Sequence, residues 1–296
     1  MPPAFGDTLR ILEPAPHVLA FYDGRVPGVR LHSLQPNWLD DGAYEAGIAS
    51  YAVWDGTEAL VYDTHISLTH ARIIRDTLAA RGVRRFTVVL SHWHDDHVAG
   101  NEAFADCEII ANRLTAEILT EKRPVLEAAD PPIRPLILPT RTFEGELHLQ
   151  IGTIAVQLVQ MDIHSCDGTV ARLPGGLLLA GDTLEDPVTY VDEPDRLAIH
   201  LRDLERMAGW DIHRILPNHG AQDIIAAGGY APSLIAATQA YVRKLLTAPT
   251  DADARAQDLR TFAAEGFAAG TLRYFPPYEA VHRMNVEAVM KARGKG

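Results

Sequence analysis

The sequence predicts an α/β layered fold, and three patterns along the chain predict it. Two β-rich runs flank Asp55-Gly56 between Gly47 and Asp63, and Asp-Gly between such runs is a strong hairpin signal. A helical pattern at residues 67–82 then leads into an apolar strand at 84–90. From Leu147 onward the chain repeats the order of strands, helix and strand. This alternation is typical of layered α/β domains.

The first predicted helix is defined by its apolar spacing. Leu68, Ala71, Ile74 and Leu78 recur at helical intervals, and Gly82 is suited to end the helix. The segment that follows, "RRFTVVL", has the composition of a buried strand. Together these segments predict a strand-helix-strand unit.

Proline and glycine punctuate the middle of the chain. Residues 113–122 read as a helix, and the five prolines from Pro124 to Pro139 predict a surface loop without regular structure. From Leu147 to Asp182 the chain is β-rich, with a turn at Gly175-Gly176. A helix at 194–209 and a short strand at 214–220 are predicted next.

The chain becomes helical after Tyr230, at residues 231–246 and 277–294. No internal repeat with a period of 20 to 50 residues is present. We therefore predict an α/β body at residues 1–230 and a helical C-terminal extension at residues 231–296. The extension is expected to cover a pocket of this body or to form a homodimer.

Composition excludes several classes of partner. The 27 Lys and Arg residues against 39 Asp and Glu give a net charge of −12, which repels nucleic acid and anionic membrane. Two cysteines, Cys107 and Cys166, are too few for a disulfide-stapled secreted fold. The N-terminal segment has no signal-peptide pattern, and no apolar run reaches the roughly 18 residues of a membrane span. These features predict a soluble, cytoplasmic protein.

The stretch "VVLSHWHDDHVAGN" concentrates metal-binding side chains directly after a predicted strand. His92 and His94 are two residues apart, so both side chains point to the same side of an extended chain and can share one metal ion. Asp96 and His97 follow where the chain turns, and they can aim at a second point a few ångströms away. The loop therefore predicts two neighbouring metal sites.

This loop alone does not supply enough ligands for two ions, because a catalytic zinc takes about three protein ligands. Three further candidates each follow a predicted strand: His164, Asp182 and His219. Residues at strand ends of a layered α/β fold converge on one edge, where sites are usually built. We therefore expect these three side chains to complete the site.

These residues resemble the metallo-β-lactamase superfamily of metal-dependent hydrolases. The pattern H-x-H-x-D-H is complete, and the later ligands occur in the family's order between Gly47 and Gly220. The resemblance implies an αββα four-layer sandwich with two metal ions, bridged by Asp182. It implies that the first ion is bound by His92, His94 and His164, and the second by Asp96, His97 and His219.

The resemblance also assigns a supporting role to Asp63. This residue ends "EALVYD" and matches the aspartate of the family's early D-T-G motif, which supports the ligands without binding metal itself. Here His65 stands where that glycine is expected. The roles of His65, Trp93, Cys166 and Tyr190 are left unassigned by the sequence.

Two divalent ions explain the residue types at this site. Imidazoles suit Zn²⁺, and Fe or Mn are also compatible. A pair of ions lowers the pKa of a bridging water, so a bridging hydroxide is the expected nucleophile. Asp96 and Asp182 are the expected catalytic carboxylates: both offset the charge of the ions, and Asp96 can accept a proton from the nucleophile.

Two positions point away from antibiotic hydrolysis. The segment "HSCDGTVARLPGGLLLAGD" is similar to the third motif of the B1 β-lactamases, but it ends in Asp182 where those enzymes have cysteine. His97 stands where they have a residue that does not bind metal. Glu185 and Asp186 would repel an anionic group. We therefore expect a neutral small-molecule substrate of the ester, lactone or thioester type.

Two alternatives remain open at this level. One is a mononuclear iron oxidoreductase similar to the persulfide dioxygenases of the same superfamily, which use the equivalents of His92, His164 and Asp182. The other is hydrolysis of a β-lactam, a sulfate ester or a phosphate ester. Metal identity and oxygen consumption separate the oxidoreductase from the hydrolases.

Overall fold

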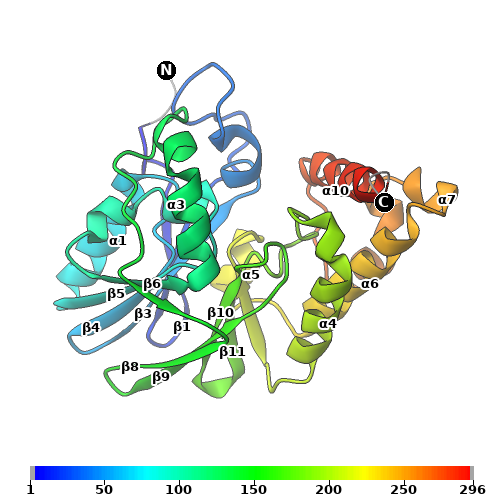
Figure 1. Cartoon of the computed structure of the whole chain (residues 1–296). Helices are drawn as coiled ribbons and strands as arrows, with labels where there is room; N and C mark the ends of the chain where they lie inside the picture. The colour runs from blue at the N-terminus through cyan, green and yellow to red at the C-terminus, as the bar shows by residue number, and fades with distance from the viewer. Residues whose placement is uncertain (1–3, 294–296) are drawn as a thin grey trace.

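The computed structural model describes residues 4–293, which form two β-sheets facing each other with helices outside both (Figure 1). The first sheet has the strand order β1-β2-β3-β4-β5-β6-β7 and the second the order β12-β11-β10-β9-β8. The strands of the first sheet are β1 (Arg10–Ala15), β2 (Val18–Asp23), β3 (Ile48–Asp55), β4 (Glu58–Tyr62), β5 (Arg85–Val89), β6 (Glu108–Asn112) and β7 (Arg141–Phe143). Those of the second are β8 (Glu146–Ile151), β9 (Ile154–Gln160), β10 (Thr169–Leu173), β11 (Leu177–Gly181) and β12 (Arg214–Pro217).

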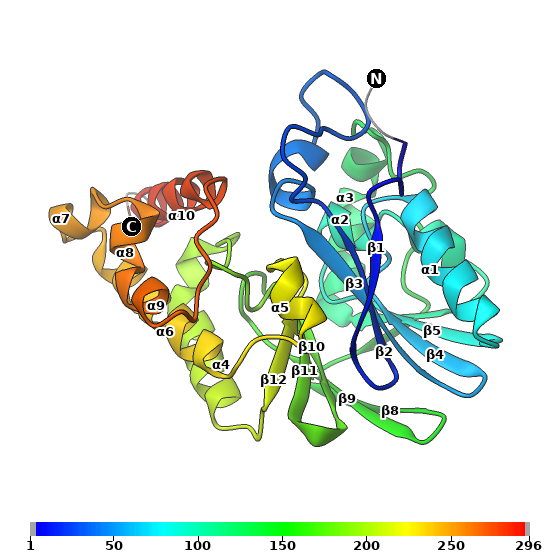
Figure 2. The ribbon, with the colours of Figure 1, turned by 180° about the vertical axis from the view of Figure 1, so that it is seen from behind.

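Helices complete the four layers on both outer sides (Figures 1 and 2). Helices α1 (Leu68–Ala80) and α3 (Arg113–Glu127) cover the first sheet, while α4 (Leu197–Ala208) and α6 (Ser233–Thr247) lie on the side of the second sheet. The remaining helices are α2 (Asp95–Val98), α5 (Gln222–Ala226), α7 (Ala252–Arg255), α8 (Leu259–Phe262), α9 (Ala264–Ala268) and α10 (Tyr278–Arg293). The predicted αββα sandwich with C-terminal helices is confirmed.

Helix α1 forms for the reasons that its sequence indicates. The Ser67 side chain accepts a hydrogen bond from the backbone N–H of His70 and so caps the first turn. Ala71, Ile74 and Leu78 are buried on one face and pack in the cluster between α1 and the first sheet. The helix is therefore held by one apolar stripe and a capped N-terminus.

Strands β1 and β2 were not predicted, and the burial of β2 explains why. All six of its residues are buried, because Leu19 and Phe21 face the α1 layer while Ala20 and Tyr22 face the second sheet. A strand that is buried on both faces has no alternation of polar and apolar residues, so the periodicity of the sequence does not identify it. Its identity as a strand depends on pairing with β1 and β3.

The predicted loop from Pro124 to Pro139 is partly wrong, because α3 continues through Pro124 to Glu127. Proline removes one backbone hydrogen bond, but here it stands in the last turn of the helix. Leu126, two residues later, is buried against the first sheet. That packing keeps the last turn helical.

Three tyrosines of the first sheet tie the two sheets together. The hydroxyl of Tyr22 donates to the carbonyl of Gly220 (2.8 Å), that of Tyr51 to Pro217 (2.5 Å), and that of Tyr62 to Thr169. All three rings are buried, so each hydroxyl needs a partner inside the protein. Each bond is worth on the order of 1 kcal/mol. Together they fix the ends of β10 and β12 relative to the first sheet.

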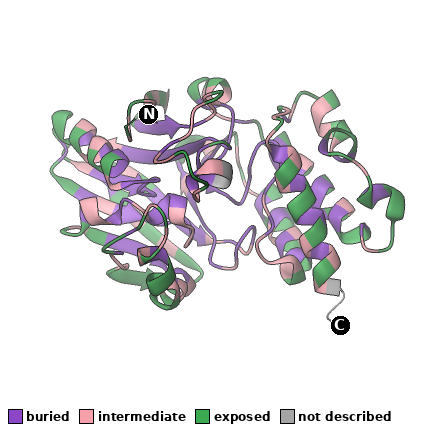
Figure 3. Cartoon of the chain, turned by 90° about the horizontal axis from the view of Figure 1, so that it is seen from above, coloured by how far each residue is buried: buried purple, intermediate pink, exposed green. Residues whose placement is uncertain are grey.

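The C-terminal helices share their buried residues with the core between the sheets. Tyr241, Leu245, Phe262 and Tyr278 belong to the same apolar cluster as residues of both sheets. Figure 3 shows the buried residues concentrated in the sheets and on the inner sides of the C-terminal helices. The division of the chain near Tyr230 stays a prediction. None of the helices within residues 4–293 is long and apolar enough to cross a membrane.

Candidate metal centre

The seven predicted ligands meet at one edge of the sandwich because they follow strands that end there. Strands β4 and β5 run parallel, as do β11 and β12, so their carboxyl ends point the same way. His92 and His94 follow β5, and Asp96 and His97 lie in the short helix α2. The other three follow β9, β11 and β12: His164, Asp182 and His219.

The first cluster consists of three imidazoles and one carboxylate. The Nε2 atom of His92 lies 2.9 Å from Nδ1 of His94, which lies 3.0 Å from Nε2 of His164. With Asp182, the ligand atoms of this set all lie within 4.8 Å of one another. Three ring nitrogens this close form a binding site for one cation.

The second cluster lies beside the first. Nε2 of His97 is 3.3 Å from Oδ1 of Asp96, and Nε2 of His219 is 3.2 Å from the other oxygen of the same carboxylate. All three side chains are buried. The set offers two nitrogens and a carboxylate, a mixture that suits a divalent ion.

Asp182 stands between the two clusters. Its Oδ2 atom lies 3.1 Å from Nε2 of His97 and 3.3 Å from Nε2 of His219 in the second cluster. The same atom lies 3.6 Å from Nε2 of His92 and 3.8 Å from Nε2 of His164 in the first. Its Oδ1 atom is buried and has no hydrogen-bond partner in the described part of the chain. An unpartnered buried carboxylate oxygen requires a cation or a donor.

Outer partners turn the ring nitrogens of these histidines toward the centre. Nδ1 of His164 lies 2.9 Å from the carbonyl of Tyr190, and Nδ1 of His219 lies 2.6 Å from the carbonyl of Gly47. Because a carbonyl can only accept, these Nδ1 atoms carry the protons and both Nε2 atoms present lone pairs. Such outer acceptors are the usual means by which proteins orient metal-binding histidines.

Asp63 performs the same function for His97. Its Oδ2 atom lies 3.0 Å from Nδ1 of His97 and accepts a hydrogen bond of 2.6 Å from the side-chain amide of Asn218. Its other oxygen accepts from the backbone N–H of Ser91 at 2.7 Å, at the start of the ligand loop. Asp63 is buried, and of the predicted ligands these three hydrogen bonds reach His97 alone, so Asp63 lies behind the predicted site.

Electrostatics separate His92 and His164 from His97 and His219. Burial lowers the pKa of His92 well below its usual value, and that of His164 to about 4, so both rings are neutral. Burial also acts to lower the pKa of His97 and His219, but the carboxylates of Asp182 and Asp96 outweigh it and raise both. The second cluster therefore attracts positive charge, which a divalent ion would supply.

His65 occupies the position at which the family's D-T-G motif has glycine. Asp63 and His65 both adopt left-handed backbone angles, with φ of 66° and 70°. A glycine takes this conformation without strain, whereas histidine needs support. His65 is buried, stacks on His70 at 4.5 Å and accepts a hydrogen bond from the backbone N–H of Ile66. These contacts hold the turn without glycine.

Three supporting residues were not predicted. Asn218 precedes His219 in "PNHG", and a polar side chain directly before a predicted ligand was the available signal. Asp192 lies 3.6 Å from Nε2 of His94, and no sequence pattern marked it. Asn285 is a polar residue on the buried face of a helix. A polar residue at a core position of a helical pattern was the available signal.

The expectation that Glu185 and Asp186 face a substrate is wrong. Both side chains are buried: Glu185 accepts from the hydroxyl of Tyr278, and Asp186 accepts from the hydroxyl of Tyr230. Burial raises the pKa of Glu185 to about 7 and that of Asp186 to about 6. The C-terminal segment covers both carboxyl groups, which the sequence does not reveal.

Trp93, Tyr190 and Cys166 lie close to the first cluster. The ring of Trp93 packs edge-on against His94 at 4.3 Å, and that of Tyr190 against His164 at 5.8 Å. Both rings are half-buried and border the first cluster. Burial and the nearby Glu193 raise the pKa of the Cys166 thiol to about 12, so it is neutral at physiological pH.

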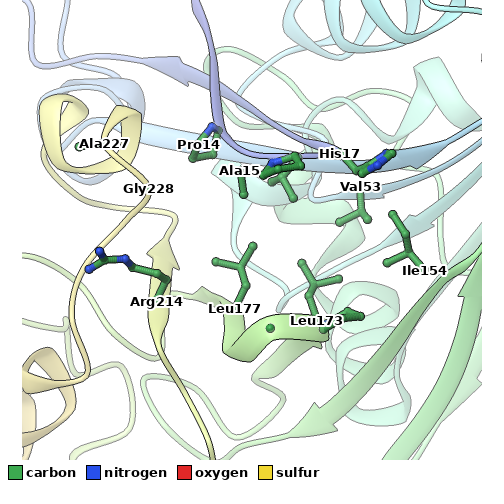
Figure 4. Close-up of a pocket in the computed structure, with 14 residues that line it drawn as sticks. Pro14, Ala15, His17, Val53, Ile154, Leu173, Leu177, Arg214, Ala227 and Gly228 are labelled. Atoms are coloured by element: carbon green, nitrogen blue, oxygen red, sulfur yellow. The ribbon is translucent and has the colours of Figure 1, made fainter.

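A separate cavity lies away from these clusters (Figure 4). It measures about 520 Å³ and is lined by residues such as Val53, Leu177 and Arg214. Leu177 and Arg214 begin β11 and β12, whereas Asp182 and His219 follow the opposite ends of those strands. The cavity is therefore separated from the metal centre by the length of the second sheet.

Comparisons with known proteins agree with this geometry. The family model for the metallo-beta-lactamase superfamily matches residues 44–255. VMB-1 superposes with a TM-score of 0.59 at 17% identity, over 79% of this chain and 96% of that one. The metallo-beta-lactamase from Pontibacter korlensis superposes with a TM-score of 0.55 at 16% identity, over 77% and 99%. At these identities the likeness establishes the fold alone.

Two curated proteins match a short segment. Lactamase-like protein notP of Aspergillus sp. (strain MF297-2) is 40% identical over 55 residues, 18% of this chain and 17% of that protein. Atrochrysone carboxyl ACP thioesterase of Passalora fulva is 40% identical over 55 residues, 18% of this chain and 16% of that protein. The chain thus matches about a sixth of the length of these relatives. The family match, which covers well over half of the chain, shows that the chain belongs to the metallo-β-lactamase superfamily, and the fold agrees with it.

Proposed function

We propose that this protein is a dinuclear metal-dependent hydrolase that cleaves an ester, a lactone or a thioester. The position of Asp182 is the observation that carries the proposal. One of its oxygens lies within 3.8 Å of inward-facing nitrogens from both clusters, and its other oxygen has no partner in the described residues. A carboxylate in this position is suited to bridge two ions.

The donor atoms fit two divalent ions, and Zn²⁺ suits their chemistry best. His92, His94 and His164 would hold the first ion, and the second would be held by Asp96, His97 and His219, with Asp182 shared. When bound, such a pair lowers the pKa of a water molecule and polarises the bond to be cleaved. Fe and Mn are also compatible with imidazole and carboxylate ligands.

Asp96 is the proposed proton acceptor. Its two oxygens diverge toward His97 and His219, so one can bind metal while the other is free to take a proton from the attacking water. The flanking histidines overcome burial and lower the pKa of Asp96 to about 2, so the carboxylate is ionised at neutral pH. Burial keeps this proton exchange separate from bulk water.

A neutral acyl group is the proposed substrate. Asp95 and Asp192 bring two further carboxyl groups close to His94, so an anionic substrate group would meet like charge beside the first cluster. One of the two segment relatives bears the name of a thioesterase, which supports an acyl substrate. Asp182 in place of the B1 cysteine argues against a β-lactam.

The test joins metal analysis with a substrate panel. We expect about two ions per chain after expression in zinc-supplemented medium, and hydrolysis of a thioester, ester or lactone. β-Lactam, sulfate-ester and phosphodiester substrates test the competing hydrolases, and oxygen consumption with a persulfide tests the dioxygenase alternative. Less than one ion per chain, or oxygen-dependent turnover with a single iron, would refute the proposal.

A further inference from the structure

We propose that Asn285, on the C-terminal helix α10, is a positioning residue for the first metal site. The inference rests on the proposed metal centre, and it gives the C-terminal extension a specific role. Helix α10 would act on the site through the loop at residues 189–192. This loop carries the outer partners of two first-site ligands, His94 and His164.

Asn285 holds this loop through both ends of its amide. Its Oδ1 accepts the backbone N–H of Val191 at 2.8 Å, and its Nδ2 donates to the carbonyl of Thr189 at 2.9 Å. The same Nδ2 also donates to the hydroxyl of Tyr241 at 3.1 Å. Asn285 is fully buried, so water cannot replace these bonds if the amide is removed.

The loop in turn orients the first-site histidines. The carbonyl of Tyr190, between the two residues that Asn285 binds, accepts from Nδ1 of His164 at 2.9 Å. The backbone N–H of Asp192 bonds back to the carbonyl of His164 at 3.3 Å. The side chain of Asp192 lies 3.6 Å from Nε2 of His94. A shift of this loop therefore changes the orientation of two ligands together.

A second contact from α10 supports the same loop. The hydroxyl of Tyr278 donates to Glu185 at 3.0 Å, and the other carboxylate oxygen of Glu185 accepts the backbone N–H of Tyr190 at 2.8 Å. Tyr278 and Asn285 are seven residues apart, so they lie on the same face of the helix. This face of α10 thus binds the loop on both sides of the Tyr190 carbonyl.

The second site is supported from a different part of the fold. Nδ1 of His97 is oriented by Asp63, and Nδ1 of His219 by the carbonyl of Gly47 next to β3. Neither of these two bonds involves α10. The two ions should therefore respond differently when the contact of Asn285 is lost, because only the first depends on the C-terminal helix.

The experiment is a stepwise Co²⁺ titration of the full-length protein, followed by visible absorption and by competition with a chelator. His164→Ala identifies which binding step and which spectral band belong to the first site. Asn285→Ala should weaken that step roughly 10-fold and alter its band, which is the scale of loss for outer-sphere partners of metal ligands. The other step should change less than about 2-fold.

Val289→Ala is the matched control. Val289 is also buried on α10, but its loss removes packing without removing a bond to the loop. The inference requires that this variant leave both Co²⁺ steps unchanged. Equal weakening of both steps in Asn285→Ala, the same weakening in Val289→Ala, or no change in Asn285→Ala would overturn it.

The outcome for the proposed function is separable. If the wild-type protein binds two Co²⁺ ions with the expected response to Asn285→Ala but cleaves no acyl substrate, the proposed function fails and this inference stands. Uptake of less than one ion per chain by the wild-type protein would overturn both.

Discussion

Replacing Asp63 by asparagine tests whether the second metal site depends on a buried acceptor behind His97. The Oδ2 atom of Asp63 faces two donors, Nδ1 of His97 at 3.0 Å and the amide of Asn218 at 2.6 Å, while Oδ1 faces the N–H of Ser91. Asparagine has only one oxygen, so one of these donors must face an NH₂ group instead. If that donor is His97, its ring takes the other tautomer and Nε2 carries the proton, which prevents it from binding metal.

The expected magnitude follows from the loss of an outer partner. Such losses typically reduce metal affinity by about 10-fold to 100-fold, which corresponds to roughly 1.4 to 2.8 kcal/mol. The upper end applies here, because Asp63 is buried and contacts three donors. The first ion should be nearly unaffected, since these three hydrogen bonds of Asp63 do not reach His92, His94 or His164.

Chelator competition with Zn²⁺ measures the two dissociation constants separately. Asp55→Asn provides the control. Asp55 also ends a strand of the first sheet, but its carboxylate accepts hydrogen bonds from Thr153. It lies near the start of β4, whereas Asp63 follows the end of β4. If Asp63→Asn binds both ions with wild-type affinity, the supporting role of Asp63 is refuted. Equal weakening of both ions would show that the substitution acts on the whole fold.

Three further predictions follow from the same geometry. Asp182→Ala should leave fewer than two ions per chain and lower hydrolysis more than about 100-fold, since a shared ligand matters more than an outer partner; two retained ions with full activity would exclude the bridge. Chelation of both ions should lower the melting temperature, because each ion at 100 times its Kd stabilises the fold by about 2.7 kcal/mol; an unchanged melting temperature after verified metal removal would contradict this. Burial raises the pKa of Asp186 from 3.8 to about 6, although hydrogen bonds from Arg273 and Tyr230 act to lower it. Between pH 3.8 and about 6 the folded state therefore binds one more proton than the unfolded state, and the protein loses roughly 3 kcal/mol of stability as the pH rises through this range. Asp186→Asn should remove this part of the pH dependence in denaturant titrations, and an identical pH profile in the variant would contradict it.

The sequence determined the parts of this protein that depend on local pattern. The Asp55-Gly56 turn and the apolar spacing of α1 are short-range signals, and both elements formed where they were predicted. The predicted ligands come together for a similar reason. His92, His94, Asp96 and His97 lie within six residues, and strand ends on parallel strands meet at one edge whatever the details of packing.

The tertiary structure decided what depends on contacts between distant segments. The strand β2 has no alternation because both of its faces are covered, and α3 passes Pro124 because Leu126 is buried beyond it. The burial of Glu185 follows from Tyr278, 93 residues later in the chain. These outcomes depend on which surfaces meet, and that is not encoded in any short window of residues.

The metal centre shows both kinds of information at once. The types and spacing of the seven predicted donors belong to the sequence, and the structure brings them together in two neighbouring clusters. The orientation of each imidazole depends on a partner from another part of the fold, such as the carbonyls of Gly47 and Tyr190. A backbone carbonyl is present at every residue and so leaves no mark in the sequence. Only the folded chain determines which carbonyl faces which ring, and therefore which nitrogen is left to bind metal.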